Sequence, residues 1–479
     1  MFQKTEFNVN FDITHNIIAG DFLNRPGKEL LILGVNASAE KIMTIYGFEK
    51  KSETYVLLIE KTIPKDIVVF DTISDAEGRR LVLLLSAKIL FVLDFNKEDF
   101  QIIGPVESIY LNKRPQFVAR KSLVQDLNGD GLDDIAISGF SDLRIFLQQV
   151  DGHFLRNDLV IEPIVDMGSE QIAFAETPFF NVDANNDDLA DIVVVRDGHL
   201  AVFEQSQNRV FLNSSVSVTL PIPASRMPWW YLRDPNGETA DQSELQHKKV
   251  ESVMDINGDD VIDLLIMNTQ SSGLLDRDNR YEVYYGRMLL NNLTFETSLA
   301  TDISSKGTLT APILEDVNFD GRKEFFVMSF DIGLAQIIGA MISGKIKQDV
   351  FVFSLDDNDL YGKQPNFYKS VGLSFSLSSG SIGQAVTLLV DIDGDKLKDL
   401  ILSQGDQKLA IYSGEATKRQ FKQKKLQYKI KLPIDGEMVV ATHLSSLLRQ
   451  DIIIRYGRQD EASLRRKVVI LSSGERKST

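Results

Sequence analysis

A nine-residue pattern of carboxylate and amide side chains occurs five times in this chain. Its first copy places oxygens at positions 1, 3, 5 and 9, on Asp126, Asn128, Asp130 and Asp134, and an apolar run follows. With the backbone carbonyl of Leu132 at position 7, such oxygens can surround one hard cation, because Ca²⁺ takes about six to eight oxygen ligands in irregular geometry. Several carboxylates this close together repel one another unless a cation lies between them.

The other four copies keep the same spacing, so the sequence predicts up to five Ca²⁺ sites, each on one turn. The predicted ligand sets are Asp183, Asn185, Asp187, Leu189 and Asp191; Asp255, Asn257, Asp259, Val261 and Asp263; Asp316, Asn318, Asp320, Arg322 and Glu324; and Asp391, Asp393, Asp395, Leu397 and Asp399. In each set the position-7 residue contributes its backbone carbonyl.

Position 6 of the pattern needs a sharply turned backbone, which glycine adopts at the lowest cost. Gly131 and Gly321 fill it in two copies. Asp188 and Asp260 fill it in two others, and Asp tolerates the left-handed region better than most residues. Lys396 in the fifth copy is the least suitable of the five.

Neither an EF-hand nor a set of metal-free acidic turns accounts for the pattern as well as these cation sites do. An EF-hand needs a bidentate Glu at position 12 and a helix on each side. Position 12 of the first copy is Ile137, inside a β-branched run, so the EF-hand interpretation fails. Acidic surface turns without a metal would not require a shared spacing of 1, 3, 5 and 9.

Composition narrows the possible functions. The 479 residues carry a net charge of −16, which argues against nucleic acid as a partner, and five Ca²⁺ would bring this to about −6. The absence of cysteine excludes disulfides and thiol catalysis. No apolar run is long enough to cross a bilayer. Met1 is followed by no signal-like apolar segment, so we expect either a cytosolic protein or an exported one whose signal is not included.

The carboxylate pattern belongs to a longer repeat. Degenerate copies begin at residues 21, 71 and 443, and the eight copies together have a mean period of about 60 residues. This period suits a four-stranded propeller blade with long loops. In the third repeat, β-type runs precede and follow the pattern, and an Asp151-Gly152 turn indicates a hairpin between the last two strands.

The sequence therefore predicts a single-domain, all-β, eight-bladed β-propeller, with seven blades as the alternative. The last repeat ends after its third strand, and Phe2–Phe7 has the composition of the missing fourth strand. Closure of the ring by this strand would remove exposed sheet edges. The predicted blades cover residues 14–64, 65–117, 118–177, 178–249, 250–309, 310–384, 385–436, and 437–479 together with 1–13.

The loop and the β-run that follows it resemble the FG-GAP/VCBS repeats of integrin α-subunit propellers and bacterial extracellular propellers. The resemblance covers the whole chain and is strongest from Asp126 to Phe154. With the four strands of each blade lettered A to D in chain order, it implies calcium in the loops between the first two strands, the A–B loops, and partner binding on the opposite face. The chain departs from the integrin pattern because it has eight repeats, no cysteine and no literal Phe-Gly and Gly-Ala-Pro segments.

Antiparallel blades place A–B and C–D turns at one end of the ring and B–C and D–A turns at the other. The two largest insertions, residues 225–249 and 331–347, are D–A and B–C connections, so they should lie opposite the predicted cations. The first contains Trp229, Trp230 and Tyr231. Aromatic side chains in a long loop suit a sugar or a protein hot spot, although ordinary packing over the channel is an alternative.

We therefore predict a calcium-stabilised binding module for protein adhesion or assembly, with glycan binding as the alternative. The histidines lack metal-ligand spacing, and neither a nucleophile elbow nor a phosphate loop is present. A polysaccharide lyase or hydrolase built on loop carboxylates remains the enzymatic alternative. Because extracellular calcium modules bind at about 10⁻⁴–10⁻³ M, we expect an extracellular, cell-surface or periplasmic location.

Overall fold

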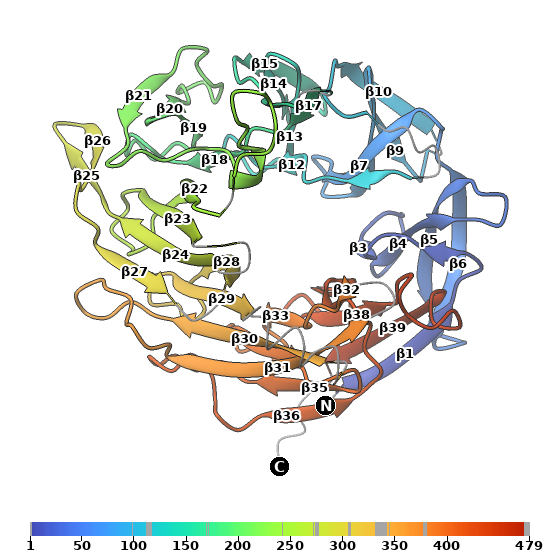
Figure 1. The fold of residues 1–479 in the computed structure, drawn as a ribbon. Coiled ribbons are helices and arrows are strands. Elements are labelled where there is room, and N and C mark those ends of the chain that lie inside the picture. The colour runs from blue at the N-terminus through green and yellow to red at the C-terminus, as the bar shows by residue number, and fades with distance from the viewer. Residues whose placement is uncertain are drawn as a thin grey trace.

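Eight sheets of four or five strands surround a central opening in the computed structural model of the protein (Figure 1). Within each blade, strands A to D run outward from this opening. The eight-bladed propeller prediction is thus confirmed, and the seven-bladed alternative is wrong. The structure describes residues 2–97, 99–111, 117–168, 170, 172–241, 243–271, 273, 277–304, 308–330, 343, 345–376 and 381–473.

The first four blades follow the order of the chain. Blade 1 contains β2 (Asp12–Ile13), β3 (Ile18–Gly20), β4 (Glu29–Val35), β5 (Lys41–Glu49) and β6 (Thr54–Thr62). Blade 2 contains β7 (Ile67–Ser74), β8 (Arg80–Ser86), β9 (Ile89–Asp94) and β10 (Asp99–Pro105), with β11 (Ala119–Arg120) parallel to β7. Blade 3 contains β12 (Val124–Gln125), β13 (Asp134–Ser138), β14 (Leu143–Gln148) and β15 (Phe154–Leu159). Blade 4 contains β18 (Phe179–Val182), β19 (Asp191–Arg196), β20 (His199–Phe203) and β21 (Val216–Thr219).

The other four blades complete the ring. Blade 5 contains β22 (Gln246–Met254), β23 (Asp263–Ser271), β24 (Arg277–Tyr284) and β27 (Thr301–Ser304). Blade 6 contains β28 (Thr308–Glu315), β29 (Glu324–Phe330), β30 (Lys345–Phe353), β31 (Phe367–Ser376) and β32 (Ser381–Ile382). Blade 7 contains β33 (Thr387–Val390), β34 (Asp399–Ser403), β35 (Lys408–Tyr412) and β36 (Leu426–Lys429). Blade 8 contains β37 (Val439–Thr442), β38 (Asp451–Arg455), β39 (Lys467–Ser473) and β1 (Phe2–Asn8).

The ring closes through its first strand, as predicted. β1 pairs antiparallel with β39 from Phe2 opposite Ser473 to Asn8 opposite Lys467. The predicted boundary at residue 13 was too late, because β2 already pairs with β4 of blade 1. The seam between the last and first blades therefore lies between Asn8 and Asp12.

One turn and two blade boundaries differ from the positions predicted from the sequence. Asp71 does not begin a turn but lies inside β7, and the A–B turn of blade 2 follows at residues 75–79. β22 starts at Gln246 and β28 starts at Thr308, so each begins inside the range predicted for the preceding blade. Strands that are longer than the minimal repeat cause these shifts, because the carboxylate pattern marks only the turn.

The hydrophobic core consists of layers between neighbouring blades. Buried residues form eight clusters, and each cluster combines side chains from two adjacent blades. Leu30 and Ile32 of blade 1, for example, pack with Ile453 and Ile470 of blade 8. The B strands are buried on both faces, which explains why they read as continuous apolar runs. Each blade therefore depends on both neighbours for burial of its apolar surface.

Two additional hairpins extend from the ring. β16 (Ile164–Met167) and β17 (Ile172–Ala175) lie in the D–A connection between blades 3 and 4. β25 (Gly286–Leu289) and β26 (Asn292–Phe295) lie in the C–D connection of blade 5. Neither hairpin was predicted from the sequence. None of the helical segments in the described ranges has the length and apolarity required to span a bilayer.

Candidate functional site

The five carboxylate turns share one backbone conformation. Position 6 is left-handed in all five, as its composition predicts, with φ between 63° and 88° at Asp260 and Gly321 as the extremes. Position 4 is left-handed as well, which the sequence analysis did not identify. The position-4 residues are Gly129, Asn186, Gly258, Phe319 and Gly394. Two left-handed residues fold each turn back on itself and direct its side chains inward.

The acidic residue at position 1 organises each turn. In the first copy, Asp126 accepts hydrogen bonds from the backbone N–H groups of Gly129 at 2.8 Å and Gly131 at 2.9 Å. Asp391 accepts the equivalent bonds from Gly394 at 2.6 Å and Lys396 at 2.8 Å. Lys396 adopts a φ of 75°, so the side chain that seemed unsuitable does not prevent the turn. The carboxylate therefore replaces the backbone partners that a tight loop cannot supply.

The acidic residue at position 9 has a different role. Its side chain is buried, and it begins strand B in every copy. Asp134 accepts bonds from Leu127 N–H in its own turn at 3.0 Å and from Gln148 N–H, at the end of strand C where the C–D turn begins, at 2.8 Å. Asp263 joins Ile256 and Gly286 in the same way. Position 9 thus holds the A–B and C–D turns together at one end of each blade.

Two of the three blades without the full pattern keep this carboxylate. Glu29 accepts bonds from the N–H groups of Phe22 and Leu23, and Asp451 accepts bonds from those of Ser445 and Ser473. Blade 2 differs, because β8 begins at Arg80. A position-9 acid is therefore part of the blade architecture, whether or not its turn has the other carboxylates.

The residues at positions 1, 3 and 5 fit a hard cation by composition and placement. In the fifth turn, carboxylate oxygens of Asp391, Asp393 and Asp395 all lie within 4.8 Å of one another. In the second turn, the buried Oδ1 of Asn185 accepts no hydrogen bond from the described residues. In the first turn, by contrast, Asn128 Oδ1 accepts a bond from Asp130 N–H at 3.1 Å. Each predicted ligand set therefore lies on one turn, and in the fifth turn three carboxylates lie close enough together to share one cation.

Burial raises the pKa of the position-9 carboxyl in each of the five carboxylate turns. The pKa is raised to about 6 for Asp134 and Asp191, and to about 7 for Asp263, Glu324 and Asp399. Desolvation is the main cause in each case, and backbone hydrogen bonds oppose it. Nearby carboxylates raise these pKa values further, so a bound cation would lower them.

This burial predicts a pH-dependent stability. A carboxyl whose folded pKa is raised stabilises the protein below its ordinary pKa, and this contribution is lost as pH rises through 6–7. We expect the melting temperature in EGTA to fall between pH 5 and pH 8, and to fall less in Ca²⁺. Thermal unfolding across this range tests the expectation, and Asp399→Asn should flatten the EGTA profile. An EGTA profile that is flat or rises with pH would contradict it.

The aromatic residues lie at the other end of the ring, in a D–A connection. Trp229, Trp230 and Tyr231 form the short helix η1 (Trp229–Tyr231). The two tryptophan rings are 5.3 Å apart in an edge-to-face arrangement, and Trp230 is 51% exposed. The second predicted insertion, residues 331–347, lies outside the described residues except for Ser343 and the start of β30.

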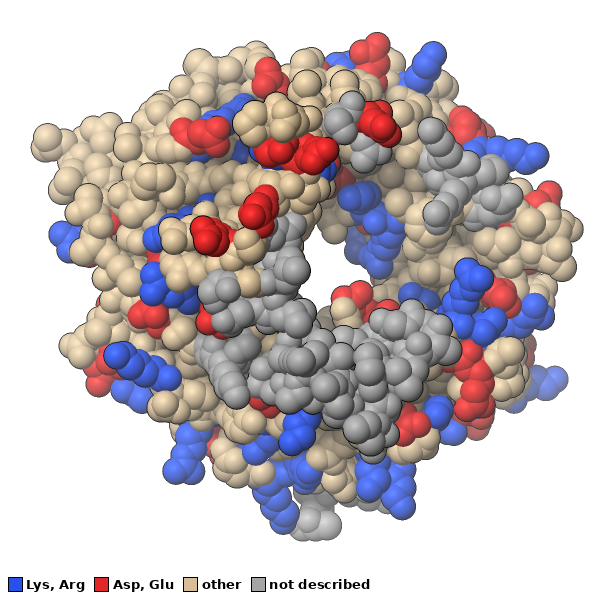
Figure 2. All heavy atoms as spheres, viewed as in Figure 1, with Lys and Arg blue, Asp and Glu red and all other residues tan. Residues whose placement is uncertain are grey.

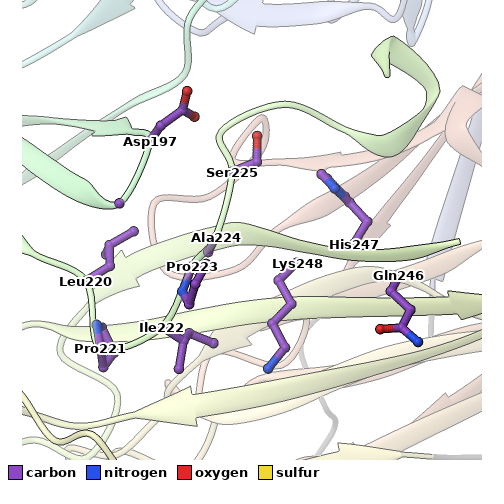
Figure 3. A pocket seen from close by; sticks show the side chains of 11 residues that line it. Asp197, Leu220, Pro221, Ile222, Pro223, Ala224, Ser225, Gln246, His247 and Lys248 are labelled. Carbon is purple, nitrogen blue, oxygen red and sulfur yellow. The ribbon is translucent and has the colours of Figure 1, made fainter. Parts of the chain in front are cut away.

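A shallow cleft lies beside this connection, between blades 4 and 5. Its volume is about 520 Å³, and it is lined by the B–C turn of blade 4 at residues 197–198, the linker 220–225 and the start of β22. Figure 3 shows Gln246 and Lys248 pointing to one side of β22 and His247 pointing to the other. His247 contacts the carbonyl of Met227 at 2.7 Å, which fixes the first residues of the aromatic connection. The sequence analysis did not identify this cleft.

Among known proteins, this chain is similar in fold to propeller structures with low sequence identity. No known family and no curated protein matches the chain. The Dos1 propeller covers 100% of this chain and 96% of its own, at 10% identity and a TM-score of 0.45. An Agrocybe aegerita lectin that recognises non-reducing terminal N-acetylglucosamine covers 90% of each chain, at 10% identity and a TM-score of 0.36. The WD40 domain of SCAP from fission yeast covers 99% and 98%, at 11% identity and a TM-score of 0.34.

Proposed function

We propose that this protein is a calcium-stabilised binding module whose ligand face is the end of the ring opposite the carboxylate turns. The observation that carries the proposal is the shared geometry of the five turns. Each has two left-handed residues, a position-1 carboxylate bonded to backbone N–H groups and a buried position-9 acid. Such a turn holds its oxygen donors close together before a cation arrives.

Calcium is the cation that these donors suit best. The side chains at positions 1, 3 and 5 offer only oxygen, which excludes the sulfur and nitrogen ligands that zinc prefers. Magnesium requires a tight octahedron and keeps most of its water, whereas calcium accepts carboxylate, amide and carbonyl oxygens in irregular geometry. The cation would neutralise repulsion within each turn and is assigned no chemical step.

The opposite end is proposed as the ligand face because exposed aromatic surface and a cleft lie together there. Trp230 is half-exposed on the connection that follows the cleft-lining linker 220–225. Protein adhesion or assembly is the first candidate. Glycan binding is the second, because indole rings stack on sugars and the cleft also offers Asp197 and Gln246 as hydrogen-bonding groups.

The same proposal includes the family of this protein and its location outside the cytosol. The turns support a relationship to FG-GAP/VCBS-type propellers, and millimolar calcium outside the cytosol would fill sites of this class. We assign no catalytic role to the loop carboxylates. Polysaccharide turnover by the purified protein in Ca²⁺ would instead favour the lyase or hydrolase alternative.

Substitution of the two tryptophans tests the ligand face. We expect Trp229→Ala/Trp230→Ala to weaken binding of any glycan detected on an array, or of any protein ligand, by about tenfold or more, since buried aromatic anchors dominate interfaces. Leu290→Ala is the matched control, because Leu290 is 96% exposed on a C–D connection at the opposite end. If binding survives the double substitution but is lost in the control, the ligand binds at the end that carries the carboxylate turns. That result would contradict the proposed ligand face.

A further inference from the structure

The β16–β17 hairpin presents an apolar surface to solvent. Val165 lies opposite Phe174, and Met167 lies opposite Ile172. Directly opposed residues of an antiparallel pair point to the same face of a sheet, so these four side chains share one face. Their exposed fractions are 40% and 44% for the first pair and 63% for each residue of the second. The ring of Phe140, in the neighbouring B–C turn, lies 5.2 Å from that of Phe174 and extends the surface.

The other face of the hairpin is attached to the aromatic connection. Asp166 forms two hydrogen bonds with the guanidinium of Arg233, at 2.7 and 2.6 Å. Near the base of the hairpin, Arg226 donates to the hydroxyl of Thr177 at 3.3 Å. A bidentate Arg–carboxylate contact fixes the relative orientation of the two side chains as well as their distance. The hairpin is therefore held against the ligand face with its apolar side outward.

The segments that form and flank the hairpin are mostly acidic, and one of their carboxylates, Glu176, pairs with Lys121 at 2.8 Å. Residues 160–178 and 226–245 contain two basic side chains, Arg226 and Arg233, and both have the local contacts described above. The acidic side chains in the same segments are Glu162, Asp166, Glu170, Glu176, Asp234, Glu238, Asp241 and Glu244. Figure 2 shows Asp and Glu gathered over the part of this end where β13, β17 and β18 lie in Figure 1. An apolar surface within a negative field favours a positively charged partner.

We propose that the outer face of the β16–β17 hairpin, formed by Val165, Met167, Ile172 and Phe174, docks a protein segment that carries apolar side chains flanked by Lys or Arg. This inference rests on the proposed function and names the partner class for its ligand face. Contiguous exposed apolar surface of this kind marks interaction sites in folded proteins. The four side chains have no hydrogen-bonding groups with which to recognise a sugar.

The charge distribution also argues against two other occupants. A second copy would bring the same acidic surroundings to the contact, together with a net charge of −16 without calcium, or about −6 with five Ca²⁺, so like charges would oppose association. An anionic membrane surface would be repelled for the same reason. A cationic protein segment gains from both the apolar contact and the field.

Selection from a displayed random peptide library tests the proposal. Wild-type protein in Ca²⁺ is the bait, and enriched peptides are then measured against three variants. Met167→Ser/Ile172→Ser removes the centre of the apolar face without adding charge. Trp230→Ala alters the neighbouring connection. Leu447→Ser/Leu448→Ser is the matched control, because these residues are 82% and 73% exposed on an A–B turn at the opposite end.

We expect enriched peptides to combine apolar residues with Lys or Arg, and their Kd to rise about tenfold or more in the hairpin variant, in line with the loss of a hot spot. The control should stay within about twofold, and added salt should weaken binding. Unchanged far-ultraviolet circular dichroism and melting temperature would show that the hairpin variant remains folded.

Other outcomes separate this inference from the proposed function. Peptides that lose binding only in Trp230→Ala, or that are acidic, would overturn the hairpin inference and leave the ligand face in place. Peptides that lose binding only in the Leu447/Leu448 variant would overturn both. No enrichment, or a concentration-dependent dimer abolished by the hairpin variant, would overturn the inference alone, since the tryptophan and calcium experiments judge the proposed function separately.

Discussion

Calcium is expected to raise the melting temperature of this protein by about 13 °C over the value in EGTA. A cation at 100 times its Kd stabilises the native state by about 2.7 kcal/mol per site. Unfolding entropy of about 2.1 cal/mol/K per residue gives about 1 kcal/mol/K for the whole chain. Five occupied turns therefore contribute about 13 kcal/mol and predict a shift of about 13 °C.

Differential scanning fluorimetry or calorimetry with Ca²⁺, Mg²⁺ and EGTA measures this shift. Asp259→Asn, at position 5 of the third turn, should reduce the calcium shift by about a fifth, because one of five sites is weakened. Glu60→Gln is the matched control, since Glu60 is an exposed acid on β6, outside every turn. Equal melting temperatures in Ca²⁺ and EGTA would refute the structural role of calcium, and an equal shift with Mg²⁺ would refute the choice of cation.

Removal of residues 1–9 should have the second large effect. β1 contributes seven residue pairs to blade 8, and Phe7 packs against Tyr46 and Tyr55 of blade 1. Without β1, the row of backbone groups on β39 is exposed as a sheet edge, which promotes aggregation. We expect a loss of stability of about 5 kcal/mol or more and a tendency to associate, measured by denaturant unfolding and size-exclusion chromatography.

A peptide in trans provides the control for this deletion. A synthetic peptide of residues 1–9 should bind the truncated protein and restore much of its stability, because the pairing is intermolecular β-augmentation in that arrangement. A peptide with the same residues in scrambled order should not, since Phe2 would lose its contact with Tyr428 of blade 7 and Phe7 its contact with Tyr46 of blade 1, on the other face of the strand. A truncated protein that is monomeric and as stable as the full chain would show that β1 does not close the ring.

The repeat could be read from the chain because its signals are local. A carboxylate turn and the β-run after it are contiguous, so their spacing reveals strands A and B directly. Residues 472–479 do not have the pattern of a fourth strand, and the segment Phe2–Phe7 does. Together these two observations indicated how the ring closes. The error at Asp71 has the same origin, because an isolated Asp in β7 and the true turn at residues 75–79 look alike without the other carboxylates.

The β16–β17 hairpin lacked such a signal. Its strands have four residues each, and no Asn-Gly or Asp-Gly turn joins them. Its position depends on the Asp166–Arg233 contact, whose partners are 67 residues apart. A contact over that distance can be identified only once blades 3, 4 and 5 are placed side by side.

The sequence by itself indicated eight blades, with seven as the alternative, and the five oxygen-rich turns, because the signal of each repeat lies within a few consecutive residues. It also indicated closure by the first strand, through the fourth strand that the last repeat lacks, although that closure pairs residues as far apart in the chain as Phe2 and Ser473. Only the tertiary structure separated the two roles of the turn carboxylates. Positions 1, 3 and 5 lie within one turn, whereas the position-9 acid also bonds a residue well beyond that turn, as Asp134 does with Gln148 at the end of strand C. The same structure placed an apolar hairpin face, the aromatic connection and a cleft at one end, because that arrangement arises from packing between blades.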